Sequence, residues 1–277
     1  MSYTYQLIKA HAHGNDFLLL DDSSLAGDVD RPALARAVCH RHRGIGADGL
    51  IFFQPDARAH AVRMALLNAD GSYSEVSGNG VRCLAAWIAI QSGTTSGSEI
   101  DIVTDAGMKR LRLLDRTGSH LKFRAAMGQP EALTKASLDV DGGAVEVITL
   151  RVGNPQCVVL GPVTHERLHG LASKLAVHPH FPQGTNVELA AVESPARVRI
   201  LIWERGVGPT EASGTGACAA AVAAMAYGGA ARDVEVMSPG GTQRVEWQDD
   251  GLYLTGVAEI IATCQWTGTL AARHASR

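Results

Sequence analysis

Two segments of the chain share a pattern of a serine, a glycine turn and an apolar run long enough for a buried helix. The two turns are Ser77-Gly78-Asn79-Gly80 and Ser213-Gly214-Thr215-Gly216, and the apolar runs follow at residues 82–91 and 216–227. A helix that is apolar on nearly all sides must be enclosed by other elements. The pattern therefore predicts two buried helices, each surrounded by the strands of its own half of the chain.

The start of each predicted helix is a candidate anion site. Backbone N–H groups in a first helical turn have no partner inside the helix and carry the positive end of its dipole. Glycines let a ligand approach these groups, so Gly78, Asn79, Gly214 and Thr215 are expected to bind a carboxylate. Each serine taken alone is also an ordinary N-cap residue. Two such turns together favour one substrate contacted by both.

Most of the remaining chain is typical of short strands bounded by Gly, Asp, Asn or Pro. Strands are expected at residues 5–10, 17–20, 50–53, 62–67, 100–104, 111–114, 121–125, 145–150, 157–160, 186–190, 198–203, 234–237, 244–247 and 252–255. Two further helices are expected at residues 32–41 and 165–176.

These elements predict an α+β chain of two pseudo-symmetric lobes. Each lobe is expected to be a β-sheet or barrel wrapped round a central apolar helix, with the active site in the cleft between the lobes. The first lobe is assigned to residues 1–120, joined by a C-terminal strand at about 258–277, and the second to residues 121–257.

Composition narrows the class of protein. The chain has 277 residues, 46% of them hydrophobic and 19% charged, with a net charge of -3. That charge gives no reason to expect nucleic acid or an anionic membrane as a partner. The five cysteines are scattered without a CxxC pair, so neither a disulfide scaffold nor a zinc site is expected. The sequence predicts a cytoplasmic enzyme that uses no metal and no cofactor.

Seven short motifs follow one another along nearly the whole chain. They are His11-Ala12-His13-Gly14-Asn15-Asp16-Phe17, Asn68-Ala69-Asp70-Gly71-Ser72, Gly78-Asn79-Gly80-Val81-Arg82-Cys83, Gly153-Asn154-Pro155, Gly184-Thr185-Asn186-Val187, Glu204-Arg205-Gly206 and Ser213-Gly214-Thr215-Gly216-Ala217-Cys218. In this order and spacing the set resembles the diaminopimelate epimerase family, from near residue 5 to about residue 265.

The resemblance implies a pyridoxal-independent epimerase that interconverts LL- and meso-diaminopimelate, a step of lysine and peptidoglycan biosynthesis. It implies a homodimer, and two facing acid/base residues that move the α-proton, here at the positions of Ser77 and Ser213. It also implies a set of side chains that hold the non-reacting amino-acid end of the substrate. By motif, these are Asn15, Asn68, Asn154, Asn186, Glu204 and Arg205.

The chain departs from the family at the residues that would move the proton. The family has cysteine where this chain has Ser77 and Ser213, and it usually has histidine where this chain has Gln156. A hydroxyl is a poor base unless a neighbour accepts its proton. We therefore expect diaminopimelate to bind and turnover to be slow or absent relative to a two-thiol enzyme.

Three functions remain compatible with these residues. The first is epimerisation of diaminopimelate or a close amino acid with Ser77 and Ser213 as the acid/base pair. The second is a cofactor-free isomerase or lyase reaction on the same fold, with one hydroxyl moving protons. The third is a catalytically idle homologue that binds amino acids. Retention of the Asn, Glu and Arg set favours a diaminopimelate-like ligand in all three.

Overall fold

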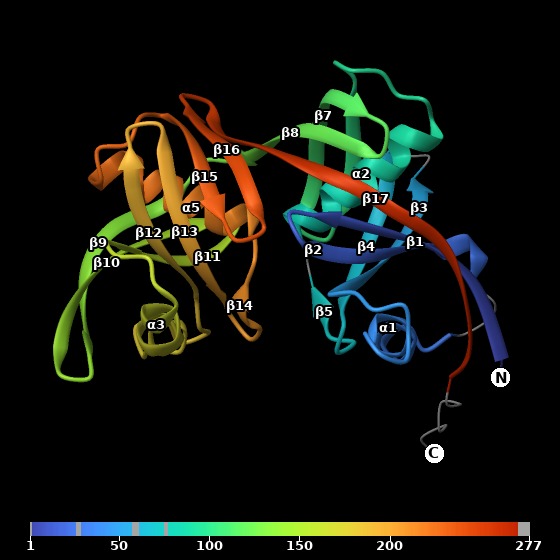
Figure 1. The fold of residues 1–277 in the computed structure, drawn as a ribbon, viewed down its shortest axis with the longest axis horizontal. Helices are drawn as coiled ribbons and strands as arrows, with labels where there is room; N and C mark the ends of the chain where they lie inside the picture. Colours follow the sequence, from blue (N-terminus) through green and yellow to red (C-terminus); the bar gives the residue numbers. More distant parts are fainter. Residues whose placement is uncertain (1, 26–28, 57–60, 75–76, 271–277) are drawn as a thin grey trace. The chain divides into compact units, whose positions relative to one another are not determined.

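The computed structural model describes residues 2–25, 29–56, 61–74 and 77–270 (Figure 1). The chain divides into two compact units, one formed by Met1–Phe123 with Val257–Arg277 and the other by Arg124–Gly256. Strands make up most of the described chain and helices are few, so the chain predicted as α+β is mostly β with a few helices.

In the first unit, antiparallel and parallel strand pairs alternate. β1 pairs antiparallel with β2, β2 parallel with β3, β3 antiparallel with β4, β4 parallel with β6, and β6 antiparallel with β7. The elements are β1 (Ser2–Ala12), β2 (Asn15–Asp21), the 3-10 turn η1 (Asp22–Ser24), α1 (Arg31–Cys39), β3 (Gly49–Asp56), β4 (Ala61–Asn68), β5 (Tyr73–Ser74), α2 (Gly78–Gln91), β6 (Glu99–Thr104), β7 (Gly107–Thr117) and β8 (His120–Gly128). β8 begins in this unit and belongs to the second unit from Arg124 onward.

The second unit repeats this order of pairings. β10 pairs antiparallel with β11, β11 parallel with β12, β12 antiparallel with β13, β13 parallel with β15, and β15 antiparallel with β16. The elements are β9 (Glu131–Val140), β10 (Gly143–Val152), β11 (Asn154–Leu160), α3 (His165–Arg167), the π-helical turn η2 (Leu168–Ala172), α4 (Ser173–Ala176), β12 (Asn186–Ser194), β13 (Arg197–Glu204), β14 (Gly208–Thr210), α5 (Gly214–Tyr227), β15 (Asp233–Ser238), β16 (Gly241–Gln248) and β17 (Gly251–Thr269). β17 begins in this unit and belongs to the first unit from Val257 onward.

The two apolar helices are crossover connections between parallel strands. α2 lies between β4 and β6 in the chain, and α5 lies between β13 and β15. Parallel strands need such a connection, because a tight turn can join only antiparallel strands. Both helices begin at the glycine that follows the serine, slightly earlier than the apolar runs alone predicted.

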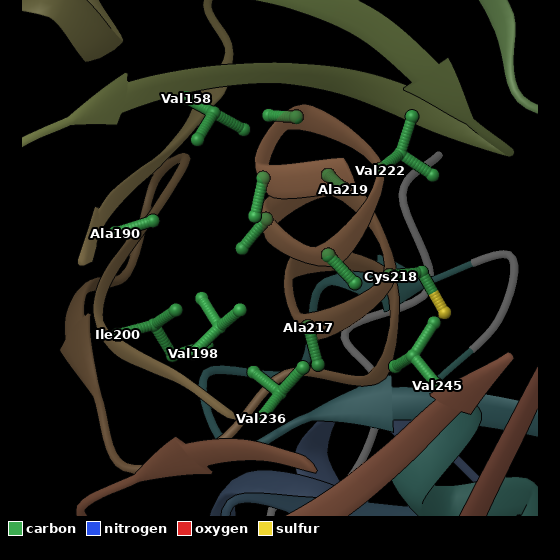
Figure 2. Packing of buried hydrophobic residues seen from close by; sticks show 14 of the residues in the cluster. Val158, Ala190, Val198, Ile200, Ala217, Cys218, Ala219, Val222, Val236 and Val245 are labelled. Atoms are coloured by element: carbon green, nitrogen blue, oxygen red, sulfur yellow. The ribbon is translucent and has the colours of Figure 1, made fainter. Parts of the chain in front are cut away.

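The core of the second unit forms around α5. Figure 2 shows Ala217, Cys218, Ala219 and Val222 of the helix in one hydrophobic cluster with valine, isoleucine and alanine side chains from the surrounding strands. Residues 216–224 of α5 are all buried, so the prediction of an enclosed helix is confirmed. Small side chains on every side of the helix let several strands approach it, because protein interiors are close-packed.

This packing predicts the effect of enlarging one helix residue. Ala219→Leu adds three carbon atoms at a fully buried position, so it should lower the free energy of unfolding by about 1–3 kcal/mol. Ala226→Leu changes an exposed position of the same helix and should stay within about 0.5 kcal/mol. Urea denaturation of both variants measures the difference, and equal midpoints would contradict the close packing around α5.

The two other predicted helices are present, but the predicted strands differ from the structure in two places. The helix expected at residues 165–176 is present as α3, η2 and α4 in succession, and α1 covers most of the helix expected at 32–41. β9 was not expected, and β17 runs far beyond the predicted 252–255, first pairing with β16 and then with β1. The last part of the expected C-terminal strand, residues 271–277, lies outside the described residues. Within the described chain, no helix is long and apolar enough to cross a membrane.

Candidate active site

In the first unit, Ser77 is the N-cap of α2. Its backbone is extended, and its Oγ accepts the N–H of Gly80 at 3.1 Å. A Cβ atom at Gly78 would meet nothing within 4 Å, so the first turn is open on that side. A hydroxyl that accepts one N–H still has its own proton to donate. The Ser77 proton is thus available to a ligand beside an open helix start.

A chain of polar side chains holds Asn79 in the first turn of α2. Its Nδ2 donates to Asn15 Oδ1 at 3.1 Å, and Asn15 Nδ2 donates in turn to Asp48 Oδ2 at 2.7 Å. The buried guanidinium of Arg82 donates to Asn79 Oδ1. Two of the predicted site residues, Asn15 and Asn79, are therefore brought into direct contact.

Ion pairs fix the position of Asp48, the hydrogen-bond partner of Asn15. Arg41 bridges Asp16 and Asp48, and Lys9 also pairs with Asp16. Burial raises the pKa of the Asp16 carboxyl, but the hydrogen bonds and charges of Arg41 and Lys9 outweigh it and lower that pKa to about 2. Asp16 is therefore ionised at neutral pH. Its carboxylate accepts the backbone N–H of Asp48, and this bond holds Asp48 beside β2.

His13 lies in the first of the seven motifs, between β1 and β2. Its ring is buried, and its Nε2 accepts the backbone N–H of Val257 at 3.2 Å. Burial, followed by the charge of Arg82, lowers the pKa of this histidine to about 4. His13 is therefore neutral and fastens β17 to the start of β2 within the first unit.

Asn68 stands apart from the Asn15 and Asn79 contact. Its Nδ2 donates to Ser72 Oγ at 2.9 Å, and its backbone N–H donates to the carbonyl of the same serine at 2.8 Å. These bonds close the turn that ends β4. The predicted ligand role of Asn68 is therefore not reflected in a contact with the other site residues of this unit.

In the second unit, Ser213 is the N-cap of α5 with nearly the same geometry. Its Oγ accepts the N–H of Gly216 at 3.2 Å and lies 3.4 Å from Thr215 Oγ1. Ser213 is buried whereas Ser77 is only half-buried. The duplicated turn of the sequence thus forms the same N-cap structure twice.

Neighbouring strands bring further predicted residues to one face of the sheet. Gln156 on β11 pairs with Asn186 on β12, so their side chains share a face. Gln156 Nε2 donates to Asn154 Oδ1 at 2.6 Å, while its Oε1 is buried with no hydrogen-bond partner among the described residues. Asn154, Gln156 and Asn186 therefore form one polar cluster.

Asn186 also orders the end of β13. Its Oδ1 accepts the backbone N–H of Arg205 at 2.9 Å, and Arg205 Nη1 donates to the carbonyl of Gln183 at 3.0 Å. Glu204 is half-buried and Arg205 is exposed. The exposed guanidinium keeps further N–H groups directed to solvent, which a carboxylate ligand could accept.

Glu188 was not singled out by the sequence analysis. It is fully buried on β12, and neither carboxyl oxygen has a hydrogen-bond partner among the described residues. Burial, and then the negative charge of Glu204, raises the pKa of the Glu188 carboxyl well above its usual range. The signal available in the sequence was a single glutamate among the apolar residues of the 187–190 segment.

Solved structures of other proteins share the fold of this chain. A hydroxyproline epimerase from Agrobacterium vitis, solved with trans-4-hydroxy-L-proline, aligns over 95% of this chain and 91% of its own, with a TM-score of 0.72. The two sequences are 15% identical, so this likeness concerns the fold alone.

Sequence comparison gives the family. The family model for diaminopimelate epimerase matches residues 7–133 and 148–261. The diaminopimelate epimerase of Desulfitobacterium hafniense is 40% identical over 276 residues, covering 92% of this chain and 96% of the relative. That of Desulforudis audaxviator is 39% identical over 280 residues, covering 94% and 99%. The chain belongs to the diaminopimelate epimerase family.

Proposed function

We propose that the chain interconverts LL- and meso-diaminopimelate, with Ser77 and Ser213 exchanging the α-proton. Family membership supports the reaction, and the duplicated N-cap geometry supports the residues. The observation that carries the assignment is that each serine accepts the third N–H of its own helix, from Gly80 or Gly216, and retains a proton to donate. Each hydroxyl is thereby held at a helix start.

The two helix starts supply the electrostatic part of the reaction. Loss of the α-proton places negative charge on the substrate carboxylate, which becomes an enediolate. Backbone N–H groups of Gly78, Asn79, Gly214 and Thr215 are fixed donors for that charge, and fixed donors need no reorganisation as the charge develops. The open side of Gly78 leaves room for the carboxylate oxygens.

The non-reacting end of the substrate is assigned to the polar residues of both units. Arg205 suits the distal carboxylate because its planar guanidinium can bond both oxygens, and Glu204 suits the distal ammonium. The Asn186 bond to the Arg205 backbone orders these residues within the second unit, and the contact of Asn15 with Asn79 orders that pair within the first. Asn68 and Asn154 complete the set. The enzyme is proposed to act without a cofactor, as a cytoplasmic homodimer of two-lobed subunits.

Proton NMR in D2O tests the reaction. The purified chain is incubated with LL- and with meso-diaminopimelate, and the α-proton signals are followed beside an enzyme-free control. Slow loss of the α-proton signal from both isomers is expected. Release of ammonia or an unsaturated product would instead indicate a lyase. If neither this chain nor its Ser77→Cys/Ser213→Cys variant exchanges either isomer, the substrate assignment is wrong.

Binding is expected to depend on the guanidinium of Arg205. Arg205→Ala removes a charged bidentate donor, whose hydrogen bonds are worth about 1.5–3 kcal/mol, so the Kd for diaminopimelate should rise about 10- to 100-fold. Arg199→Ala is the matched control, because Arg199 is an exposed arginine of β13 that pairs with Glu193. Calorimetry should show the loss only for Arg205. Equal affinities of the two variants for diaminopimelate would show that Arg205 does not contribute to binding.

A further inference from the structure

Glu188 occupies a position that the fold would otherwise fill with an apolar side chain. Side chains alternate along β12: Val187 and Leu189 pack in one hydrophobic cluster, whereas Ala190 packs in the cluster around α5. By this alternation Glu188 faces α5. A carboxyl group buried without hydrogen bonds is costly, and nothing in the packing of this core requires one.

The carboxyl lies beneath the turn that carries Ser213. A Cβ atom at Gly216 would stand 2.7 Å from Glu188 Oε1 and 3.2 Å from Ser213 Cβ. Both side chains therefore border the same small space, which exists because residue 216 is glycine. Glu188 is thus aimed at the helix start from the side opposite to solvent.

The first unit has the same construction with a different residue. Ile51 lies two positions after Gly49, which pairs with β2, just as Glu188 lies two positions after Asn186, which pairs with β11. A Cβ atom at Gly80 would stand 3.0 Å from Ile51 Cδ1 and 3.4 Å from Ser77 Cβ. An isoleucine fills this position in the first unit, so packing alone does not require a carboxyl behind Ser213. The carboxyl therefore indicates a chemical role.

The surroundings of Glu188 favour proton exchange over an ion pair. The first turn of α5 carries no charged side chain. β13 contributes Glu204, whose charge disfavours ionisation of Glu188, and β11 contributes Cys157 and the amide of Gln156. No cation among the described residues pairs with Glu188, so this carboxyl can gain or lose a proton without breaking a salt bridge.

We propose that Glu188 is a positioning residue that accepts the hydroxyl proton of Ser213 during α-proton transfer. This inference rests on the proposed function. The substrate Cα–H bond breaks, its proton forms a new O–H bond at Ser213 Oγ, and the original hydroxyl proton passes to Glu188, directly or through one water molecule. The C–H electron pair remains on the substrate as the enediolate, and the carboxylate becomes a neutral acid. Among the described residues, the corresponding position behind Ser77 is filled by Ile51.

The pH dependence of exchange tests this role. Only ionised Glu188 can accept the proton, so kcat/KM should rise with pH through a pKa well above that of an ordinary carboxyl. Glu188→Gln should lose this limb and fall at least about 100-fold, whereas Glu188→Asp should keep the limb. Ile51→Val is the matched control in the first unit and should keep both. A Glu188→Gln variant with the same profile as the unsubstituted chain would overturn the proposal.

A second measurement does not depend on turnover. The infrared C=O band of the protonated Glu188 carboxyl should persist to a higher pH than that of an ordinary carboxyl and should be absent in Glu188→Gln. Ser213→Ala should shift this band, and Ser77→Ala should leave it unchanged. If the band shifts although no diaminopimelate exchange is found, the proton coupling stands and the proposed function fails. If exchange is found but Ser213→Ala leaves the band in place, the coupling is wrong.

Discussion

Replacing Ser77 and Ser213 together by cysteine should raise the rate of α-proton exchange by about 100- to 10,000-fold, the usual contribution of a competent acid/base pair. A free thiol is already a few per cent thiolate at neutral pH, whereas a hydroxyl needs a neighbour to take its proton. Both positions are N-caps of buried helices, and a helix start lowers a thiol pKa further. Exchange into diaminopimelate in D2O, followed by NMR, measures the gain.

The single variants and a remote control complete this experiment. Each single cysteine should give only part of the gain, because inversion requires a group on both faces of the α-carbon. Ser92→Cys adds a thiol at the other end of α2 and should leave the rate unchanged. A double variant no faster than the unsubstituted chain would show that proton transfer at these positions does not limit the reaction.

Replacing Glu188 by isoleucine should remove a loss of stability that the chain otherwise suffers as pH rises. The pKa of Glu188 is raised in the folded state, so the folded chain binds the Glu188 proton more tightly than the unfolded chain does. The resulting stabilisation is fully present below the unfolded pKa and disappears as pH rises through the folded pKa. Between these two values the unfolded chain has lost the proton that the folded chain keeps. The free energy of unfolding should therefore fall by about 1.4 kcal/mol per pH unit in this window.

Urea denaturation at a series of pH values checks this prediction. Glu188→Ile copies the residue that the first unit places at Ile51, so its stability relative to the unsubstituted chain should increase with pH across the window. Glu193→Gln, at an exposed carboxyl of the same strand, should follow the unsubstituted chain. If the curve of Glu188→Ile runs parallel to that of the unsubstituted chain, Glu188 does not carry a proton in the folded state.

Much of the candidate site could be predicted from local sequence. The Ser-Gly turns predicted both helix starts, and the structure places Ser77 and Ser213 as their N-caps. The motif residues Asn15 and Asn79 are in contact, as are Asn186 and the backbone of Arg205. The helix starts depend on neighbours within a few positions of the chain, so the order of residue types suffices to indicate them. The two contacts join residues 64 and 19 positions apart, and only the match to the family motifs indicated that these residues share a site.

Other parts of the site depend on contacts between distant segments. His13 is buried and accepts a hydrogen bond from the backbone N–H of Val257, more than two hundred positions away in the chain. β9 carries mainly exposed side chains and therefore lacked the apolar pattern by which strands are recognised. The bond to His13 is made by a segment distant in the chain, whereas β9 is fixed by its pairing with the next strand, β10. The periodicity of either segment taken alone could not predict these interactions.

The sequence by itself determined the two enclosed helices, their serine caps, most strand positions and the family. Only the tertiary structure decided what lies behind each serine. Strand periodicity states that Glu188 and its neighbours alternate between two faces, but not which face meets α5. That choice follows from the parallel pairing of β11 with β12 and the crossover through α5. It buries a carboxyl behind Ser213 and an isoleucine behind Ser77, so two nearly identical turns acquire different chemistry.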